Sequence, residues 1–165
     1  MPAESKLVLR HQFQSYMNTG AASAEAGSLI GEGFTSLKEA KNPSEYSRKY
    51  VHEATERTDV VGYATQIDYT TDTYTENPVI AKIAEVSDKE LTGTDAQVDI
   101  LNVNMFEDAG TGETHAYTAY KRRYAIIPDA KGDGTDALVY SGSFKAVGDI
   151  VPGTFNGTAF TPDAT

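Results

Sequence analysis

Three consecutive runs decide the fold of this chain: LIGEGFTSL (residues 29–37), NPSEYSRKYVHE (residues 42–53) and TDVVGY (residues 58–63). The first run predicts a strand, the second is polar and carries two tyrosines, and the third predicts a returning strand. Together they predict a two-stranded excursion with little hydrophobic core of its own, and such a ribbon is only marginally stable by itself. We therefore expect another subunit to cover it.

The rest of the chain is large enough for one domain with a hydrophobic core. It has 165 residues, of which 39% are hydrophobic, and this composition is typical of a globular protein. It contains no cysteine, which excludes disulfides and thiolate metal sites. Nothing near Met1 resembles a signal peptide, and no apolar run approaches the ~20 residues that span a bilayer. We expect a protein made in the cytosol that does not insert into a membrane.

The net charge of −10 is concentrated in the middle of the chain. Residues 38–61 carry five basic and five acidic side chains, whereas residues 62–119 carry eleven acidic side chains and two lysines, a net charge of −9. This distribution argues against a surface that grips nucleic acid, because such a surface needs clustered Lys and Arg. A solvated surface that promotes solubility is the simplest explanation of the acidic block.

Alternation of apolar and polar side chains predicts strands over residues 60–74, 98–106, 114–127 and 138–150. In the second of these, the apolar phase slips between Ile100 and Leu101, as a β-bulge would cause. Asn156-Gly157 predicts a hairpin close to the C-terminus.

One helix is expected at about residues 77–88. Asn77 suits the N-cap and Pro78 the first helical position, and an apolar stripe follows at helical spacing. Residues 1–26 have weak periodicity, and we interpret them as an N-terminal arm that precedes a β-domain over residues 27–165. The predicted fold is mainly β, an antiparallel β-sandwich or barrel-like structure with this one helix and a long extended loop at about residues 38–61.

Residues that could carry chemistry are scattered. The three histidines are far apart and lack metal-ligand spacing. The acidic run at residues 129–134 fails as a calcium loop, because Lys131 and Tyr140 occupy ligand positions. The one basic cluster, residues 121–123, alternates between the faces of a strand, which favours cross-strand pairing over nucleic-acid contact. We expect no enzyme and no catalytic, cofactor-binding or metal-binding residue.

Several runs occur in an order that resembles the major tail tube proteins of long-tailed (siphophage-type) bacteriophages. The resemblance covers roughly residues 28–160. The runs that carry it are IGEGFTSL (30–37), NP (42–43), YVHE (50–53), GY (62–63), NPVI (77–80) and GDIVPGTFN (148–156).

The resemblance implies a structural virion protein without catalysis. Six subunits would form a ring, and rings would stack into a hollow tail tube that conducts DNA into the host without binding it specifically. The implied partners are other copies of the chain, a tape-measure protein, and tail tip or terminator proteins. The implied location is the phage tail, assembled in the host cytoplasm.

In that family the long loop between early strands reaches neighbouring subunits, and here it corresponds to about residues 38–61. We expect Tyr46, Tyr50, Val60 and Val61 to supply binding energy, because apolar and aromatic anchors dominate interfaces. Balanced charges such as Arg48 would supply specificity. Ordinary sheet packing is the alternative role for these side chains.

The resemblance also suggests a role for the acidic block. A tube lumen that attracted DNA would hold the genome when it should slide. We therefore expect the polar strand faces that carry Asp68, Asp72 and Asp99 to line the lumen and to repel DNA weakly.

Two other functions remain open at this point. The chain could form the inner tube of a contractile tail, a phage-derived bacteriocin or a secretion system, in which the outer surface must engage a sheath. It could instead be a monomeric β-sandwich module that binds a carbohydrate or a cell-surface ligand, which predicts a concave aromatic site and no need for a neutral, charge-rich excursion.

Overall fold

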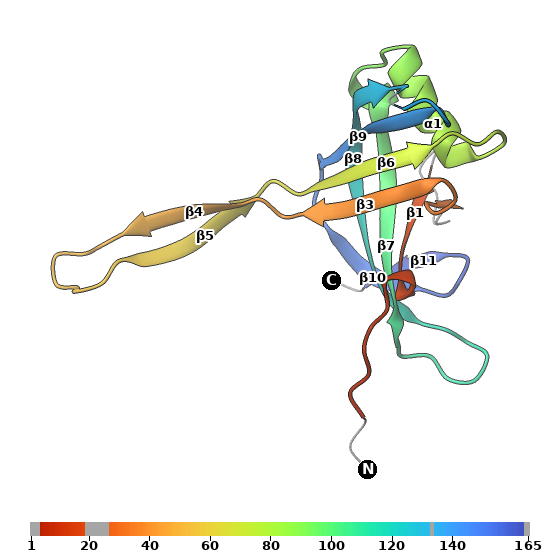
Figure 1. Cartoon of the computed structure of the whole chain (residues 1–165). Coiled ribbons are helices and arrows are strands. Elements are labelled where there is room, and N and C mark those ends of the chain that lie inside the picture. Colours follow the sequence, from red (N-terminus) through yellow and green to blue (C-terminus); the bar gives the residue numbers. More distant parts are fainter. Residues whose placement is uncertain (1–3, 19–26, 133, 164–165) are drawn as a thin grey trace.

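The computed structural model describes residues 4–18, 27–132 and 134–163. Most strands belong to one nine-stranded antiparallel sheet, and a separate two-stranded ribbon stands off its side (Figure 1). The elements in chain order are the 3-10 turn η1 (Arg10–Gln12), β1 (Phe13–Asn18), β2 (Ser28–Leu29), β3 (Phe34–Ala40), β4 (Pro43–Arg48), β5 (Arg57–Tyr63), β6 (Gln66–Asp72), α1 (Pro78–Asp88), the 3-10 turn η2 (Gly93–Ala96), β7 (Gln97–Asp108), β8 (Tyr117–Lys131), β9 (Val139–Ala146), β10 (Val151–Phe155) and β11 (Phe160–Pro162).

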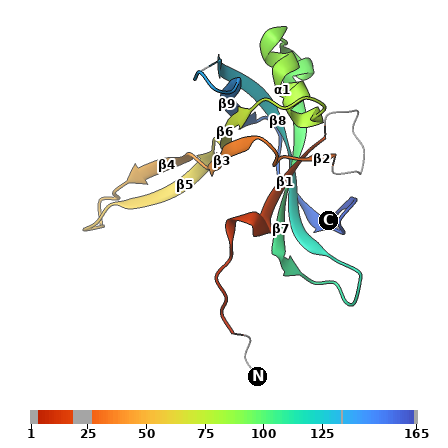
Figure 2. The same cartoon turned by 45° about the vertical axis from the view of Figure 1, so that its right-hand side comes forward.

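The sheet has the strand order β2-β1-β7-β8-β9-β6-β3, and the β10–β11 hairpin is attached to β8. The long strand β8 pairs with β10 at its start and with β9 further along. The sheet curls until β3 approaches β1 and β2 (Figure 2), and these strands line a cavity of about 540 Å³ at the open seam. The predicted mainly β, antiparallel, barrel-like fold is confirmed.

The helix α1 forms where the sequence predicts it. The Asn77 side chain accepts hydrogen bonds from the N–H groups of Val79 and Ile80, at 3.1 and 3.3 Å, and Pro78 follows at the first helical position. The apolar stripe of the helix is buried in the main core, which also contains side chains of β6, β7, β8 and β9. Asn156-Gly157 also forms the predicted hairpin, in which Phe155 pairs with Phe160.

The predicted bulge in β7 is wrong, because the strand keeps its register with β8 from Gln97 to Asn104. Ile100 and Leu101 are both buried because each face of the strand is covered by a different cluster. Ile100 belongs to the main core on the helix side, whereas Leu101 packs with the β10–β11 hairpin around Phe155. The apolar pattern slips between Ile100 and Leu101 because both faces of β7 are covered.

Residues 13–18 differ from the predicted N-terminal arm, since they form β1 and pair with β7 along their whole length. Met17 is completely buried there. The inward position two residues earlier is Ser15, whose hydroxyl donates a 2.7 Å hydrogen bond to Asn102. A polar pair thus replaces an apolar contact and hides the strand periodicity. Residues 1–3 and 19–26 of the expected arm lie outside the described part of the chain.

The strand that the sequence predicts over residues 29–37 is interrupted. Residues 31–33 form a turn between β2 and β3, closed by a 3.0 Å hydrogen bond from Phe34 N to Gly31 O. Gly33 has a positive φ of 89°, and a Cβ there would lie 2.8 Å from the carbonyl oxygen of Asp72. Glycine is required by this backbone and this contact.

Candidate functional site

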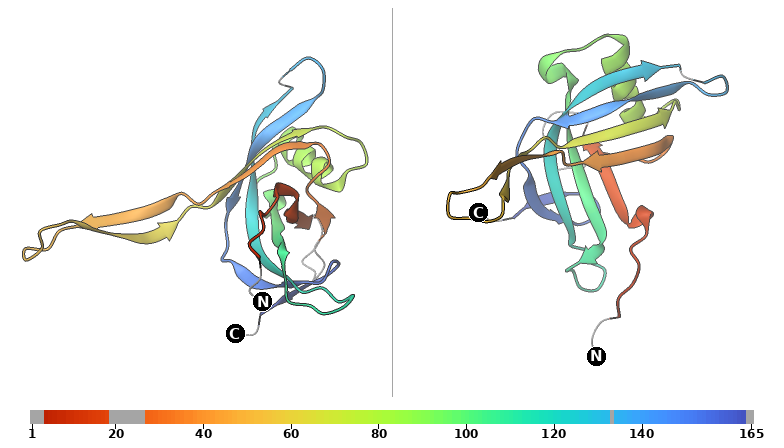
Figure 3. Two further views of the ribbon diagram at one scale, coloured as in Figure 1. Left: turned by 60° about the horizontal axis from the view of Figure 1, so that its bottom comes forward. Right: turned by 60° about the vertical axis from the view of Figure 1, so that its left-hand side comes forward.

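The expected excursion is the ribbon formed by β4 and β5, here called the ribbon. It continues the β3–β6 pair, so that residues 34–72 form one long hairpin with a break in the middle. The loop boundaries of about 38–61 need correction, because β3 extends to Ala40 and β5 to Tyr63. The ribbon points away from the barrel in every view (Figures 1 and 3), and most of its side chains are exposed.

One face of the ribbon carries a stacked cluster of aromatic and cationic side chains. The Arg48 guanidinium lies 5.0 Å from the ring centre of Tyr46 and 5.6 Å from that of Tyr50. The guanidinium of Arg57, on β5, lies 5.3 Å from the ring centre of Tyr50. Arg48 also forms an ion pair with Asp59. Its hydrogen bonds to Tyr50 and Asp59 raise the pKa of Arg48. These cation–π contacts and this ion pair join the two strands of the ribbon to each other.

A second set of ribbon side chains is apolar, and it has no such ring or ion-pair partner among the residues that the structure describes. Val60, Val61 and Tyr63 are 51%, 65% and 63% exposed. Val60 lies opposite Glu45, so it points to the face away from Tyr46 and Asp59. Val61 lies at the register shift between the strands. Exposed apolar side chains gathered on a projecting ribbon are typical of a surface that another protein covers.

The structure thus separates the five expected contact residues into two groups. Tyr46, Arg48 and Tyr50 are brought together in a cluster within the ribbon, whereas Val60 and Val61 are left open. Tyr63 belongs with the valines because it is exposed. The sequence does not reveal this, since the alternation of residues 60–74 places Tyr63 in phase with the buried Ile67 and Tyr69. Whether any of these side chains touches another subunit stays a prediction.

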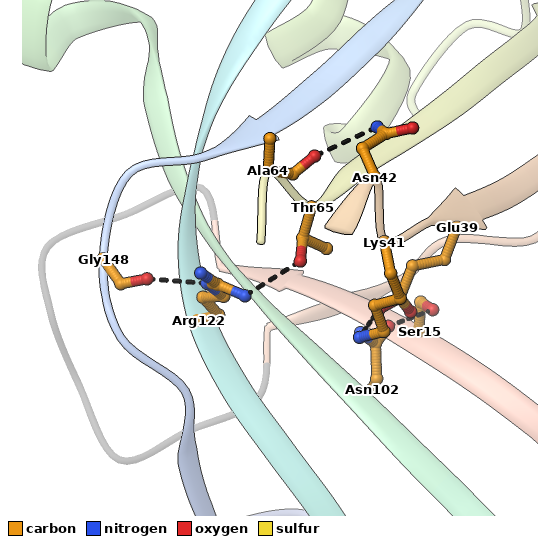
Figure 4. Close-up of polar contacts among 9 residues, drawn as sticks. All are labelled: Ser15, Glu39, Lys41, Asn42, Ala64, Thr65, Asn102, Arg122 and Gly148. Atoms are coloured by element: carbon orange, nitrogen blue, oxygen red, sulfur yellow. Dashed lines mark hydrogen bonds and ion pairs between the residues drawn. The ribbon is translucent and has the colours of Figure 1, made fainter. Parts of the chain in front are cut away.

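The ribbon joins the barrel at a root formed by residues 41–42 and 64–65 (Figure 4). Asn42 has a positive φ of 45°, which asparagine tolerates better than most residues. Its side-chain amide donates a 3.0 Å hydrogen bond to the carbonyl oxygen of Ala64. The Ala64 N–H in turn lies 3.1 Å from the carbonyl oxygen of Lys41 and 3.2 Å from that of Asn42.

Arg122 of β8 reaches this root from the barrel. Its Nε donates to the carbonyl oxygen of Gly148 at 2.6 Å, and one terminal nitrogen donates to Oγ1 of Thr65 at 3.2 Å (Figure 4). Thr65 is buried, and its carbonyl oxygen accepts a 3.0 Å hydrogen bond from Ala146 N. A cleft of about 400 Å³ opens beside these groups, between Tyr63 of the ribbon and Asp149 and Ile150 of the barrel.

The three expected lumen carboxylates lie on the sheet face opposite the main core. Asp68 and Asp72 alternate with the buried residues of β6, and Asp99 lies between Val98 and Ile100 of β7. Cations share this face, since Lys38 pairs across from Asp68, and Arg123 lies 3.3 Å from Asp99. The face therefore has mixed charge. Its position relative to a channel stays a prediction.

Most of the acidic excess lies at the two ends of the barrel instead. One group surrounds α1 and the following turns, and the other lies around the loop between β7 and β8, at opposite ends of the sheet (Figure 1). The Asp108 carboxylate organises that loop by accepting hydrogen bonds from the N–H groups of Ala116 and Gly110 and by lying 2.7 Å from His115. The Ala116 N–H is the main cause that lowers the pKa of Asp108 to about 2.

Within residues 4–18, 27–132 and 134–163, no three His, Asp or Glu side chains are grouped so that they could hold a metal ion. Over the same ranges, no helix is both long enough and apolar enough to cross a membrane.

Sequence comparison finds no matching protein-family model and no matching curated protein. The structure is similar to a chain of the anti-feeding prophage cap, the AFP tube terminating cap, with a TM-score of 0.55 and 12% identity over 93% of this chain and 95% of that one. A chain of the AFP baseplate is similar with a TM-score of 0.49 and 10% identity over 90% of this chain and 97% of that one. The likeness to the cap chain establishes a shared fold.

Proposed function

We propose that this chain is a structural subunit of a phage-tail-type tube, whose copies join through the ribbon into rings that stack around a channel. The observation that carries this proposal is the ribbon, a projecting two-stranded element with Val60, Val61 and Tyr63 exposed. A ribbon of this kind is marginally stable in water unless something covers it. The fold shared with a chain of a tube terminating cap supports the same role.

Charge favours contact between the ribbon of one copy and the barrel of the next. The ribbon with its connecting loop, residues 43–63, carries four acidic and three basic side chains, a net charge of −1, whereas residues 64–119 carry −9. Two barrels would repel each other, because like charges that are brought together destabilise an interface. A nearly neutral ribbon meets an acidic barrel with little of that cost. The free edges of β3, β4 and β5 add backbone groups that another chain can pair with.

The proposed role needs no catalysis. Copies of the chain are its first partners, and a tape-measure protein and tail tip or terminator proteins are the others. DNA would pass through the channel without specific binding, and the protein would be found in the virion tail after assembly in the host cytoplasm. If the face that carries Asp68, Asp72 and Asp99 lines the channel, its adjacent cations Lys38 and Arg123 would limit its repulsion of DNA.

A subunit that ends a tube, rather than builds it, is the second candidate. The fold likeness to the AFP tube terminating cap favours it. The inner tube of a contractile tail, bacteriocin or secretion system would use the same contacts between copies and would add a sheath outside. Assembly of the pure protein separates the first two roles, because a tube subunit stacks into long tubes and a terminating subunit stops at single rings.

Negative-stain microscopy of the purified protein over a range of concentrations tests the proposal. We expect rings or tubes with a central channel. A matched variant replaces residues 43–63 by Asn-Gly, which can connect Asn42 to Ala64 because these residues are already hydrogen-bonded at 3.0 Å. This variant should fold as a monomer and form no rings. Monomeric particles of the intact protein at every concentration would contradict the proposal and favour a monomeric ligand-binding module.

A further inference from the structure

The ribbon is connected to the barrel through a narrow root. Its strands β4 and β5 pair only with each other among the described strands, and β3 and β6 belong to the curled sheet. Two chain segments cross between these pairs, at residues 41–42 and 64–65. Whatever fixes the crossing therefore fixes the direction in which the whole ribbon points.

Small changes of direction at the root are magnified at the tip. Residues 43–50 span about 26 Å at about 3.3 Å per residue, so a swing of about 10° displaces the tip by roughly 4–5 Å. That displacement equals the spacing of neighbouring strands in a sheet, which is about 4.8 Å. A contact made by the ribbon would move out of register.

The hydrogen bonds between Asn42 and Ala64 hold the two crossing segments to each other, but they do not hold them to the barrel. Lys41 of the root pairs with Glu39 of β3, only two residues before it. The attachment to β8 and β9 is made at Thr65, through its carbonyl oxygen to Ala146 N and through its hydroxyl to Arg122. Arg122 also holds Gly148, in the loop between β9 and β10. One side chain thus ties the ribbon root to two parts of the barrel (Figure 4).

We propose that Arg122 is a positioning residue that sets the direction of the ribbon. A guanidinium suits this role because it is planar and presents several N–H donors in a fixed fork, so two acceptors are held at a defined angle. A lysine has a flexible stem and a single ammonium group, and it cannot fix both acceptors in the same way.

The consequence for assembly rests on the proposed function. A ring built from head-to-tail contacts closes only if each subunit is rotated by the correct angle from the last, and otherwise the contacts produce an open helix. The ribbon direction contributes that angle. Loss of the Arg122 contacts should therefore give fewer closed rings and more open or irregular assemblies from a subunit that still folds.

The direction itself is measured on dilute monomers, which keeps this test separate from assembly. The chain has no cysteine, so spin labels can be placed at His52→Cys on the ribbon tip and Ala81→Cys on the exposed side of α1. Pulsed electron paramagnetic resonance then gives the distribution of tip-to-helix distances. The unaltered root should give one narrow distribution, and Arg122→Met should broaden or shift it by about 4 Å or more, as the lever arm implies.

Arg123→Met is the matched control. Arg123 follows on the same strand but points to the other face, where it contacts Asp99 and Gln97. It should leave the distance distribution unchanged. Thr65→Val removes the hydroxyl acceptor with little change in volume and should act like Arg122→Met, which keeps the test decisive if the Arg122 variant does not fold. Unchanged distributions in both root variants, or equal broadening in the Arg123 control, would overturn the proposal.

Discussion

Replacing the two exposed valines of the ribbon by threonine should weaken assembly without weakening the subunit. Val60 and Val61 are 51% and 65% exposed, so about half or more of each side chain remains to be buried in a contact. Threonine has nearly the same shape and favours strands equally, so the double variant V60T/V61T should keep the stability of the monomer.

The size of the effect follows from the buried area. Burying a whole valine side chain stabilises by about 1.5–2 kcal/mol, so the exposed parts of these valines contribute roughly 1 kcal/mol each. A hydroxyl buried without a partner adds a cost of about 1 kcal/mol or more. The double variant should lose about 2–4 kcal/mol per contact, which is roughly a 30- to 1,000-fold higher concentration for ring formation.

Sedimentation velocity over a concentration series measures this threshold, and circular dichroism melting checks the monomer. Val147→Thr is the matched control, because Val147 is 50% exposed but lies outside the ribbon. Assembly of V60T/V61T at the same concentration as the unaltered protein would refute the assignment of the valines to the contact. An equal loss in the Val147 variant would refute its restriction to the ribbon.

Two further predictions concern the barrel. Gly33→Ala should lower the free energy of unfolding by at least about 1–2 kcal/mol, because a Cβ would meet the Asp72 carbonyl at a positive φ, whereas Gly62→Ala, with nothing within 4 Å, should change it little in the same urea titration. Asp108→Asn should flatten the dependence of stability on pH below about 4: the folded pKa of Asp108, about 2, lies below its ordinary 3.8, so its stabilisation is present above that range and is lost as the pH falls through it. Equal slopes for both proteins between pH 2 and 4 would contradict this.

Elements decided by local rules were predictable from the sequence. The Asn77-Pro78 start specified α1 because a side-chain cap and a preset φ act within one turn, and Asn156-Gly157 specified the last hairpin for the same kind of reason. The strand β1 was not predictable, because its inward Ser15 is stabilised by Asn102, a residue far away in the sequence. The slip at Ile100 and Leu101 was misinterpreted because periodicity does not reveal that both faces of a strand are covered.

Residues 29–63 also combine features set by local sequence with features set by tertiary contacts. The sequence by itself determined that this stretch contains a ribbon, that residues 38–61 carry no net charge, and that aromatic and β-branched side chains lie along it. Only the tertiary structure decided which of these side chains remain open. Arg48 and Tyr50 are taken up by neighbours within the ribbon, whereas Val60 and Val61 are not. Some side chains interact with a residue on the paired strand, and others with a residue on a distant strand, as Thr65 does with Arg122 of β8. These contacts depend on strand register and sheet curvature, and neither is encoded in local sequence spacing.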